Sequence, residues 1–363
     1  MHIKQQIRRL LTLEFLGNFK LAGSAWVLLM VGRGFSLPQV GLAEAVFHVV
    51  SLCCEIPSGM AADVLGRRRT LVASSAAFVL SALVMMLSRS IAGVYAAMAI
   101  NAMAYNLASG TRESITYESL LEAGRERDYL RLSSWQNIIW RAAAAAALLC
   151  AGWVRPLGHV KGYGMDLVVA LTAVAVASRL REPAVGVARG DVRLADLPAA
   201  LKKVALESAR FLRAHPRTCG MILYNALVGA VATLLRFFLQ DGLDRAGASA
   251  ALLGPLLLLM ELGGVAGSRL ALALEKLPYR GVCLLCGAGQ VCALALAASG
   301  SLLLMTAGGL LAVLCDDALQ MLTDARLNAG VPSAERATLI SVSSMCFSLV
   351  MIVLSPVAGI LSA

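Results

Sequence analysis

Charged and polar side chains recur inside stretches that are otherwise apolar, and they are the residues best able to do chemistry. Between residues 38 and 61, Glu44, His48 and Glu55 follow one another at intervals of four and seven residues, which places them on one face of a helix. An ionised group inside a membrane is costly unless it is paired or hydrated. These side chains could therefore bind a polar solute or carry protons, or they could form structural salt bridges.

The same choice applies to polar groups in other apolar segments. Arg141 and Glu261 lie nearest the middle of their segments, and His48 carries a side chain suited to proton coupling. Because the set contains acids and bases, it does not select a substrate charge. The candidates for substrate binding or proton coupling are Lys20, Glu44, His48, Glu55, Asn101, Arg112, Glu113, Asn137, Arg141, Arg236, Glu261 and Asp317.

The segments that hold these residues are expected to cross a membrane. The chain has 363 residues, of which 59% are hydrophobic and 15% are charged, against about 25% charged in soluble domains. A membrane helix needs roughly 20 apolar residues, so an all-α polytopic membrane protein with about eleven spans is predicted. The expected spans are 13–33, 38–61, 70–88, 91–111, 131–153, 162–180, 217–239, 248–270, 280–298, 302–324 and 336–361.

The basic residues predict the orientation of these spans. With the N-terminus in the cytoplasm, 24 of the 32 Lys and Arg residues fall on the cytoplasmic side and five on the outer side. This asymmetry follows the positive-inside rule. It accounts for the net charge of +10 without a nucleic-acid partner, and eleven spans would leave the C-terminus outside. The first apolar stretch lacks a signal-peptidase site and is expected to remain as a span.

Features of an enzyme or a metalloprotein are lacking. The nine cysteines are scattered through apolar stretches, so neither a disulfide framework nor a metal site is expected. The sequence contains no GxxxxGK[ST], HExxH or GxSxG motif. We expect no cofactor and no enzymatic activity, and an integral-membrane enzyme is the least favoured alternative.

A long polar segment divides the chain into an N-terminal bundle of six spans (1–180), a linker (181–216) and a C-terminal bundle of five spans (217–363). In the linker, Asp196 can cap a helix that has Pro198 in its first turn. Apolar residues then recur at helical spacing, and Lys and Arg occupy the other faces. The pattern favours a basic amphipathic helix on the cytoplasmic leaflet; a soluble linker helix is the alternative.

One motif resembles a known family. Gly59-Met-Ala-Ala-Asp63-Val-Leu-Gly66-Arg67-Arg68-Arg69 lies between the second and third expected spans and is similar to the signature loop of the major facilitator superfamily. Softer similarities to drug-exporter-like members lie in residues 33–41, 55–59, 117–120 and 332–338. Residues 261–269 occupy the corresponding place in the second half, but they lack the Asp and the Arg run.

The resemblance implies two six-helix bundles, with the twelfth helix missing from this chain. It implies that Gly59 and Gly66 allow close approach and a tight turn, and that Asp63 faces the start of span eleven, near residues 333–337, as a conformational latch. A helix N-terminus stabilises a nearby anion by about 0.3–1 kcal/mol. Arg67, Arg68 and Arg69 would pair with acids or lipid phosphates; alternatively, they only set topology.

The implied function is secondary transport of a small organic solute by alternating access, driven by protons, with export favoured over uptake. Span five lacks the antiporter glycine–proline pattern of the family and reads Arg141 followed by six alanines. The expected partners are a small-molecule substrate, protons and the lipid bilayer, and the expected state is a monomer in a bacterial inner membrane. The alternative is a non-transporting membrane protein: a sensor, an assembly partner or a truncated relic.

Overall fold

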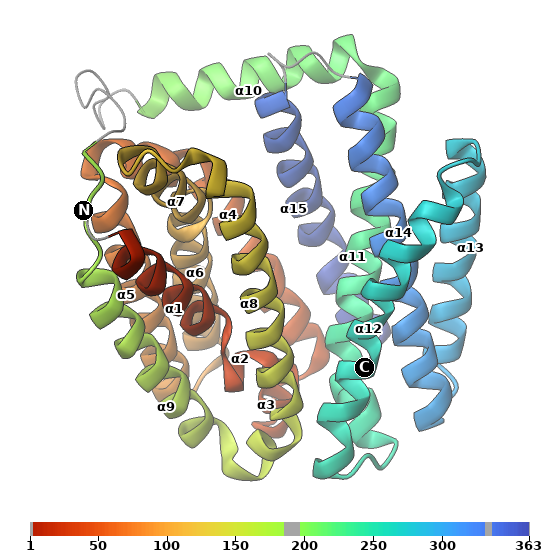
Figure 1. Ribbon diagram of the computed structural model, residues 1–363. Helices are drawn as coiled ribbons and strands as arrows, with labels where there is room; N and C mark the ends of the chain where they lie inside the picture. Colours follow the sequence, from red (N-terminus) through yellow and green to blue (C-terminus); the bar gives the residue numbers. More distant parts are fainter. Residues whose placement is uncertain (1–2, 185–196, 331–335, 363) are drawn as a thin grey trace. The chain divides into compact units, whose positions relative to one another are not determined.

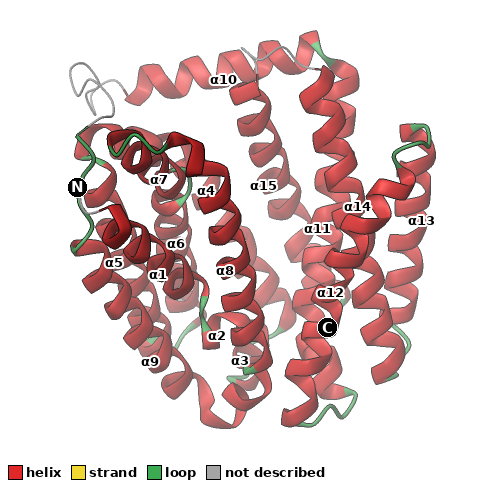
Figure 2. Ribbon diagram, in the orientation of Figure 1, coloured by secondary structure: helices red, strands yellow, loops and turns green. Residues whose placement is uncertain are grey.

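The structure is a computed structural model that describes residues 3–184, 197–330 and 336–362. These residues are almost entirely helical and include no strand (Figures 1 and 2). The helices are α1 (Ile3–Asn18), α2 (Leu21–Ser24), α3 (Trp26–Gly32), α4 (Leu37–Leu65), α5 (Arg67–Leu87), α6 (Ile91–Ala108), α7 (Thr111–Glu122), the 3-10 helix η1 (Glu126–Asp128), α8 (Tyr129–Leu149), α9 (Ala151–Ser178), α10 (Leu197–Ala214), α11 (Pro216–Arg245), α12 (Ala250–Leu274), α13 (Tyr279–Ala297), α14 (Leu302–Gly330) and α15 (Arg336–Leu361).

Nine helices in the described part of the chain are long and apolar enough to cross a membrane. The all-α polytopic membrane fold predicted from the sequence is therefore confirmed, and the expected number of about eleven spans is roughly consistent with it. Two expected spans are not among the nine. The segment 13–33 is divided into α1, α2 and α3, each too short to cross alone, and the first half of α8 is rich in Ser, Gln, Asn and Arg.

The chain forms two compact units. Unit 1 comprises Met1–Leu29 and Val46–Leu201, and unit 2 comprises Met30–Ala45 and Lys202–Ala363. In unit 1, α5 packs against α6 and α9, and α1 packs against α8 and α9. Hydroxyl groups join α5 to α6, because Ser74 and Ser81 donate hydrogen bonds to the carbonyl oxygens of Ala104 (2.7 Å) and Ala97 (2.9 Å). Such bonds between helices are a common source of association in membranes.

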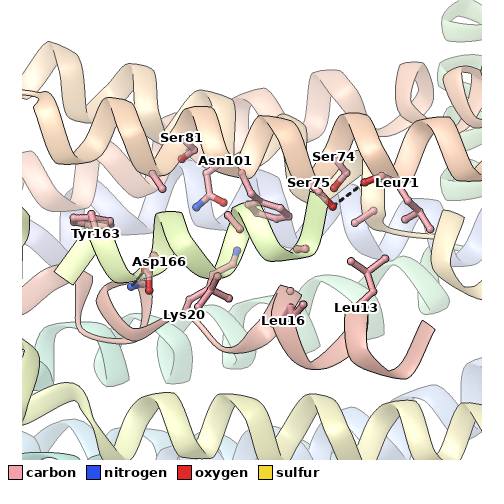
Figure 3. A pocket seen from close by; sticks show the side chains of 18 of the residues that line it. Leu13, Leu16, Lys20, Leu71, Ser74, Ser75, Ser81, Asn101, Tyr163 and Asp166 are labelled. Carbon is pink, nitrogen blue, oxygen red and sulfur yellow. Dashed lines mark hydrogen bonds between the residues drawn. The ribbon is translucent and has the colours of Figure 1, made fainter. Parts of the chain in front are cut away.

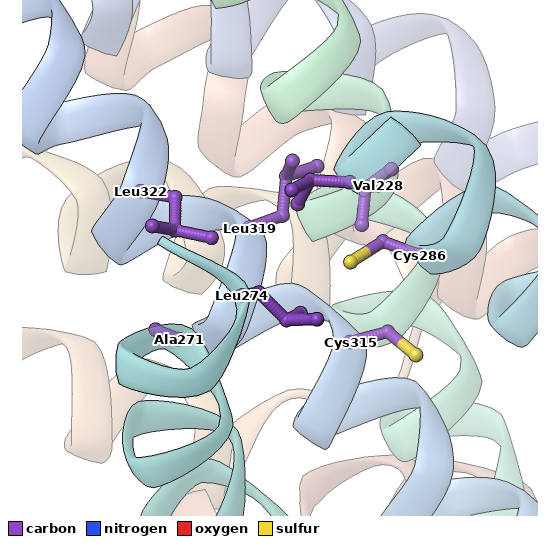
Figure 4. Packing of buried hydrophobic residues seen from close by; sticks show 8 residues of the cluster. Val228, Ala271, Leu274, Cys286, Cys315, Leu319 and Leu322 are labelled. Carbon is purple, nitrogen blue, oxygen red and sulfur yellow. The ribbon is translucent and has the colours of Figure 1, made fainter. Parts of the chain in front are cut away.

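In unit 2, α14 packs against α11, α12 and α13. Small residues bring α12 and α14 together, since a Cβ atom on Gly263 or Gly267 would overlap the backbone oxygen of Leu310 or Leu314. Figure 4 shows the apolar cluster at one end of this packing, with Leu319 of α14 among side chains from α11, α12 and α13. Close backbone contact at glycines four residues apart is typical of helix pairs in membranes.

The linker contains the predicted amphipathic helix, α10, from Leu197 to Ala214. Its expected cap, Asp196, lies outside the described residues. Phe211 is buried in unit 2 against Ile222, Leu327 and Val342, whereas the basic residues Arg210 and Arg213 are exposed. The helix therefore attaches to unit 2 through an apolar side chain near its C-terminal end.

Candidate functional site

The first expected span is interrupted at residues 19 and 20, where α1 ends and α2 has not yet begun. Lys20 precedes α2 with extended backbone angles and provides no side-chain cap. Asp166 of α9 caps α2 instead. Its carboxylate accepts backbone hydrogen bonds from Leu21 (2.6 Å), Ala22 (3.3 Å) and Gly23 (3.0 Å). A membrane provides no water for these N–H groups, so a buried carboxylate makes the break possible.

Two cavities in unit 1 meet at this break. A narrow cavity of about 80 Å³ reaches between α1, α5 and α9, and Lys20, Asn101 and Asp166 line it (Figure 3). A wider cavity of about 370 Å³ includes Asn137 of α8 and Glu113 of α7. Lys20 and Arg112 line both cavities. The fold thus brings together five of the residues singled out in the sequence.

The charged side chains around these cavities differ in the hydrogen bonds and ion pairs that they form. Arg112 donates from Nη1 to Glu14 Oε1 (3.2 Å), and Asn18 Nδ2 donates to the same oxygen (3.0 Å). The Nε atom of Arg112 is buried, and the described part of the chain offers it no hydrogen-bond partner. Lys20 Nζ lies 3.7 Å from the ring centroid of Phe78, a cation–π contact. Glu113, on the wider cavity, is exposed.

The signature motif forms a corner between two helices. Gly59 and Asp63 lie in α4, Arg67, Arg68 and Arg69 form the first turn of α5, and Gly66 alone connects the helices with a φ of +92°. That angle favours glycine and explains the tight turn at this position. At Gly59 an added Cβ would meet nothing within 4 Å among the described residues, so a close helix approach expected there is not seen.

Ion pairs and a cap hold this corner. Arg67 donates from Nη1 to Asp63 (2.7 Å) and from Nε to Glu118 of α7 (3.2 Å). Glu182 accepts the backbone N–H groups of Arg67 (2.7 Å) and Arg68 (2.8 Å) at the start of α5. An acid at a helix N-terminus satisfies free donors and complements the helix dipole. The side chains of residues 333–337, the expected latch partner of Asp63, lie outside the described part of the chain, so the latch stays a prediction.

In unit 2, Arg236 of α11 and Glu261 of α12 form an ion pair of 2.6 Å. Each side chain keeps about a third of its exposure, 32% and 33%. The pairing corresponds to the structural alternative that the sequence left open for these residues. It also leaves neither charge isolated.

We expect the Glu261→Gln variant to be less thermally stable than the double variant Arg236→Gln/Glu261→Gln. The single change leaves the guanidinium of Arg236 without its partner, whereas the double change removes both charges. Contacting residues in such a cycle usually show a coupling of about 0.5–3 kcal/mol. Melting curves of the wild type, both single variants and the double variant in detergent measure it; additive losses would contradict the pair.

Two adjacent acids lie near the middle of α14. Asp316 Oδ1 is 3.1 Å from the position a Cβ would take on Gly229 of α11, and Asp317 packs in the same way against Gly264 of α12. The two carboxylates therefore point toward different helices, and a glycine on each provides the room. Neither acid is among the residues that line the cavity of about 250 Å³ in the same unit.

The cavity in unit 2 is lined in part by hydroxyl, amide and carboxylate groups. Asn225 of α11 donates to Gln320 (2.5 Å), and Gln320 donates to Asp324 (2.9 Å). The Oδ1 atom of Asn225 is buried and accepts no hydrogen bond from any described residue. Ser343 and Phe347 of α15 complete the wall. The arrangement can hydrogen-bond a polar solute.

The remaining candidates lie outside the described cavities. Glu44 and His48 are buried in α4, at 8% and 7% exposure, and Glu55 is partly buried. Arg141 is exposed, with its guanidinium 5.2 Å from the ring centroid of Trp140. Placement near the middle of a span was thus a poor guide to burial for Arg141.

Sequence reasoning missed several acids that the structure places at capping or pairing positions, among them Glu14, Glu118, Asp166 and Glu182. Asp166 could have been noticed, since it is the one acid in the expected span 162–180. Glu14 and Glu182 carry no such signal, because Glu14 lies at the start of one expected span and Glu182 just after another, where charges are common.

Comparison with known proteins agrees with the motif. Residues 11–355 match the model of the Major Facilitator Superfamily, which covers most of the chain. No curated protein sequence matches the chain. Similar folds are found among solved structures of transporters at low sequence identity.

A point mutant of the nucleoside transporter NupG is 16% identical, with a TM-score of 0.79 over 97% of this chain and 90% of that one. A point mutant of the peptide transporter POT is 14% identical, with a TM-score of 0.70 over 97% and 88%. A D-xylose-proton symporter is 14% identical, with a TM-score of 0.66 over 98% and 88%. At these identities the likeness shows the fold, and together with the match over residues 11–355 it establishes that the chain belongs to the major facilitator superfamily.

Proposed function

We propose that the chain is a secondary transporter that moves a small organic solute across the membrane by alternating access. The observation that carries the proposal is the pair of polar-lined cavities, one inside each unit of a major facilitator superfamily fold. Transporters built from repeated bundles bind solutes near the middle of the membrane, where interrupted helices supply polar groups. The break between α1 and α2 meets the cavities of unit 1 in this way.

We further propose that protons drive transport and that the direction is export from a cell through its plasma membrane, with the N-terminus in the cytoplasm. The asymmetry of Lys and Arg supports the orientation. The carboxylates of Asp316 and Asp317 support proton coupling, because they lie near the middle of a long apolar helix. Softer similarity to drug-exporter-like members supports export. We propose that the protein acts as a monomer, with its two bundles in residues 1–180 and 217–363.

The Asp63→Asn variant is expected to transport about tenfold less than the wild type at the same level in the membrane. Asp63 holds Arg67 at 2.7 Å, and a coupling of about 1–3 kcal/mol between conformation and transport corresponds to a change of about five- to 150-fold. Cells without their own exporters are loaded with cationic, neutral and anionic fluorescent compounds, and efflux is followed with and without a protonophore.

Asp128→Asn is the matched control, since Asp128 also pairs with an arginine, Arg125 (2.6 Å), but lies outside the motif, in η1. Export that the protonophore abolishes, and that only Asp63→Asn impairs, supports the proposal. Accumulation in place of efflux would establish uptake. Absence of movement for every compound, with the protein present in the membrane, would favour the non-transporting alternative.

A further inference from the structure

The unit 1 cavities hold two cationic groups whose bonding capacity is incomplete. Lys20 Nζ has the face of Phe78 as its neighbour, and in the described part of the chain no hydrogen bond or ion pair to this amine is found. Arg112 uses Nη1 for Glu14, while its Nε donor is buried and has no hydrogen-bond partner among the residues that the structure describes. A buried hydrogen-bond donor that lacks an acceptor costs about 1–3 kcal/mol, and more when the group is charged.

The acids near these cations are already engaged or lie in water. Asp166 accepts three backbone N–H groups with its two oxygens. Glu14 is held by Arg112 and Asn18. Glu113 is exposed, so water screens its carboxylate. None of the three completes the bonding of the Lys20 amine.

The two cations also act on each other. Lys20 and Arg112 line the same two cavities, so their charges face a shared space. Arg112 Nη2 lies against Gly17, where an added Cβ would be 2.6 Å away, so the guanidinium lies over the end of α1, next to the break that contains Lys20. Like charges that line one cavity repel, and an anion placed between them removes the repulsion and gives both donors an acceptor.

We infer that Lys20 and Arg112 form a binding site for the anionic group, a carboxylate or a phosphonate-type oxyanion, of a small organic ligand. The inference rests on the proposed transport function and assigns its substrate class. The cavity of about 370 Å³ lies within the usual range for small-molecule sites of about 300–1,000 Å³. Trp140 and Phe78 supply the aromatic wall for the rest of such a ligand.

Binding to the purified protein in detergent tests the site without requiring transport. The probes are benzoate and phenylphosphonate, with benzamide and benzylamine as neutral and cationic partners of similar size, and the readout is the shift of the melting temperature with probe concentration. We expect the two anions, and neither of the other probes, to stabilise the wild type. Equal stabilisation by benzamide or benzylamine would overturn the inference, whatever the variants do.

The variants Lys20→Met and Arg112→Gln should weaken binding of the anions by about tenfold or more, because each removes a charge-assisted hydrogen bond. Lys20→Arg keeps the charge and should retain binding. Lys161→Met is the matched control, since Lys161 is exposed and is not among the residues that line these cavities. Wild-type affinity for benzoate in folded Lys20→Met and Arg112→Gln would refute the site.

Failure of this inference can be told apart from failure of the proposed function. If the protein selects anions in detergent but moves no compound of the transport panel, the binding site is supported and the transport proposal is contradicted. If the wild type and Lys20→Met export cationic or neutral compounds at the same rate, transport is supported and the anion site is contradicted.

Discussion

Replacement of Asp166 by alanine is expected to lower the free energy of unfolding by about 3 kcal/mol, since three N–H groups, one buried and two partly buried, would each lose an acceptor at about 1–3 kcal/mol. The three donors, on Leu21, Ala22 and Gly23, begin a helix of four residues that cannot supply its own cap. Thermal melting of the purified protein in detergent measures the loss.

Hydrogen exchange locates the effect. The amides of residues 21–24 should lose protection in Asp166→Ala while those of α6 keep theirs. Asp166→Asn retains one acceptor oxygen and should fall between the wild type and the alanine variant. Glu126→Ala, at an exposed acid in η1, is the control for loss of a carboxylate. Unchanged protection at residues 21–24 in Asp166→Ala would show that the cap does not hold the break.

Introduction of a methyl group at Gly263 or Gly267 is expected to destabilise unit 2 by about 1–3 kcal/mol at each site, the usual cost of overpacking. The added Cβ would overlap the backbone oxygens of Leu310 and Leu314, which cannot rotate away as a side chain can. The double variant Gly263→Ala/Gly267→Ala must separate α12 from α14 along a full turn. Its melting temperature in detergent should fall more than that of either single variant.

Gly220→Ala provides the control. Gly220 lies inside α11, and an added Cβ there meets nothing within 4 Å among the described residues. Alanine favours a helix over glycine by about 1 kcal/mol, so this change should leave stability unchanged or raise it. Destabilisation by Gly220→Ala as large as that of Gly263→Ala would mean that the loss arises from the substitution itself and not from the contact with α14.

The sequence was most informative where one local rule sufficed. Long apolar runs predicted the membrane helices, and the Gly66 motif predicted a turn, because both depend on neighbouring residues. Local rules also predicted α10 from its amphipathic spacing. The same rules failed at residues 13–33, where a mostly apolar run indicated one span and the chain forms three short helices.

The site depends on contacts that no local rule contains. Lys20 and Arg112 were recognisable as charges in apolar surroundings, but their shared cavity requires α1 and α7 to lie together. The cap of α2 comes from Asp166, more than 140 residues farther along the chain. Arg236 and Glu261 were singled out separately, and their pairing at 2.6 Å follows from the packing of α11 against α12.

The interrupted first helix has a consequence for synthesis. At about 5–20 residues per second, the ribosome makes Asp166 roughly 7–30 seconds after Leu21. The hydrogen bonds of Gln6 also form late, since its side chain bonds to Ser119 and to the backbone of Arg181. Residues 6 and 21–23 thus acquire these partners only after more than 100 further residues have been made. A nascent chain stalled before residue 166 should enter the bilayer with the N–H groups of residues 21–23 uncapped. Chaperones and membrane proteases should then have access to this segment.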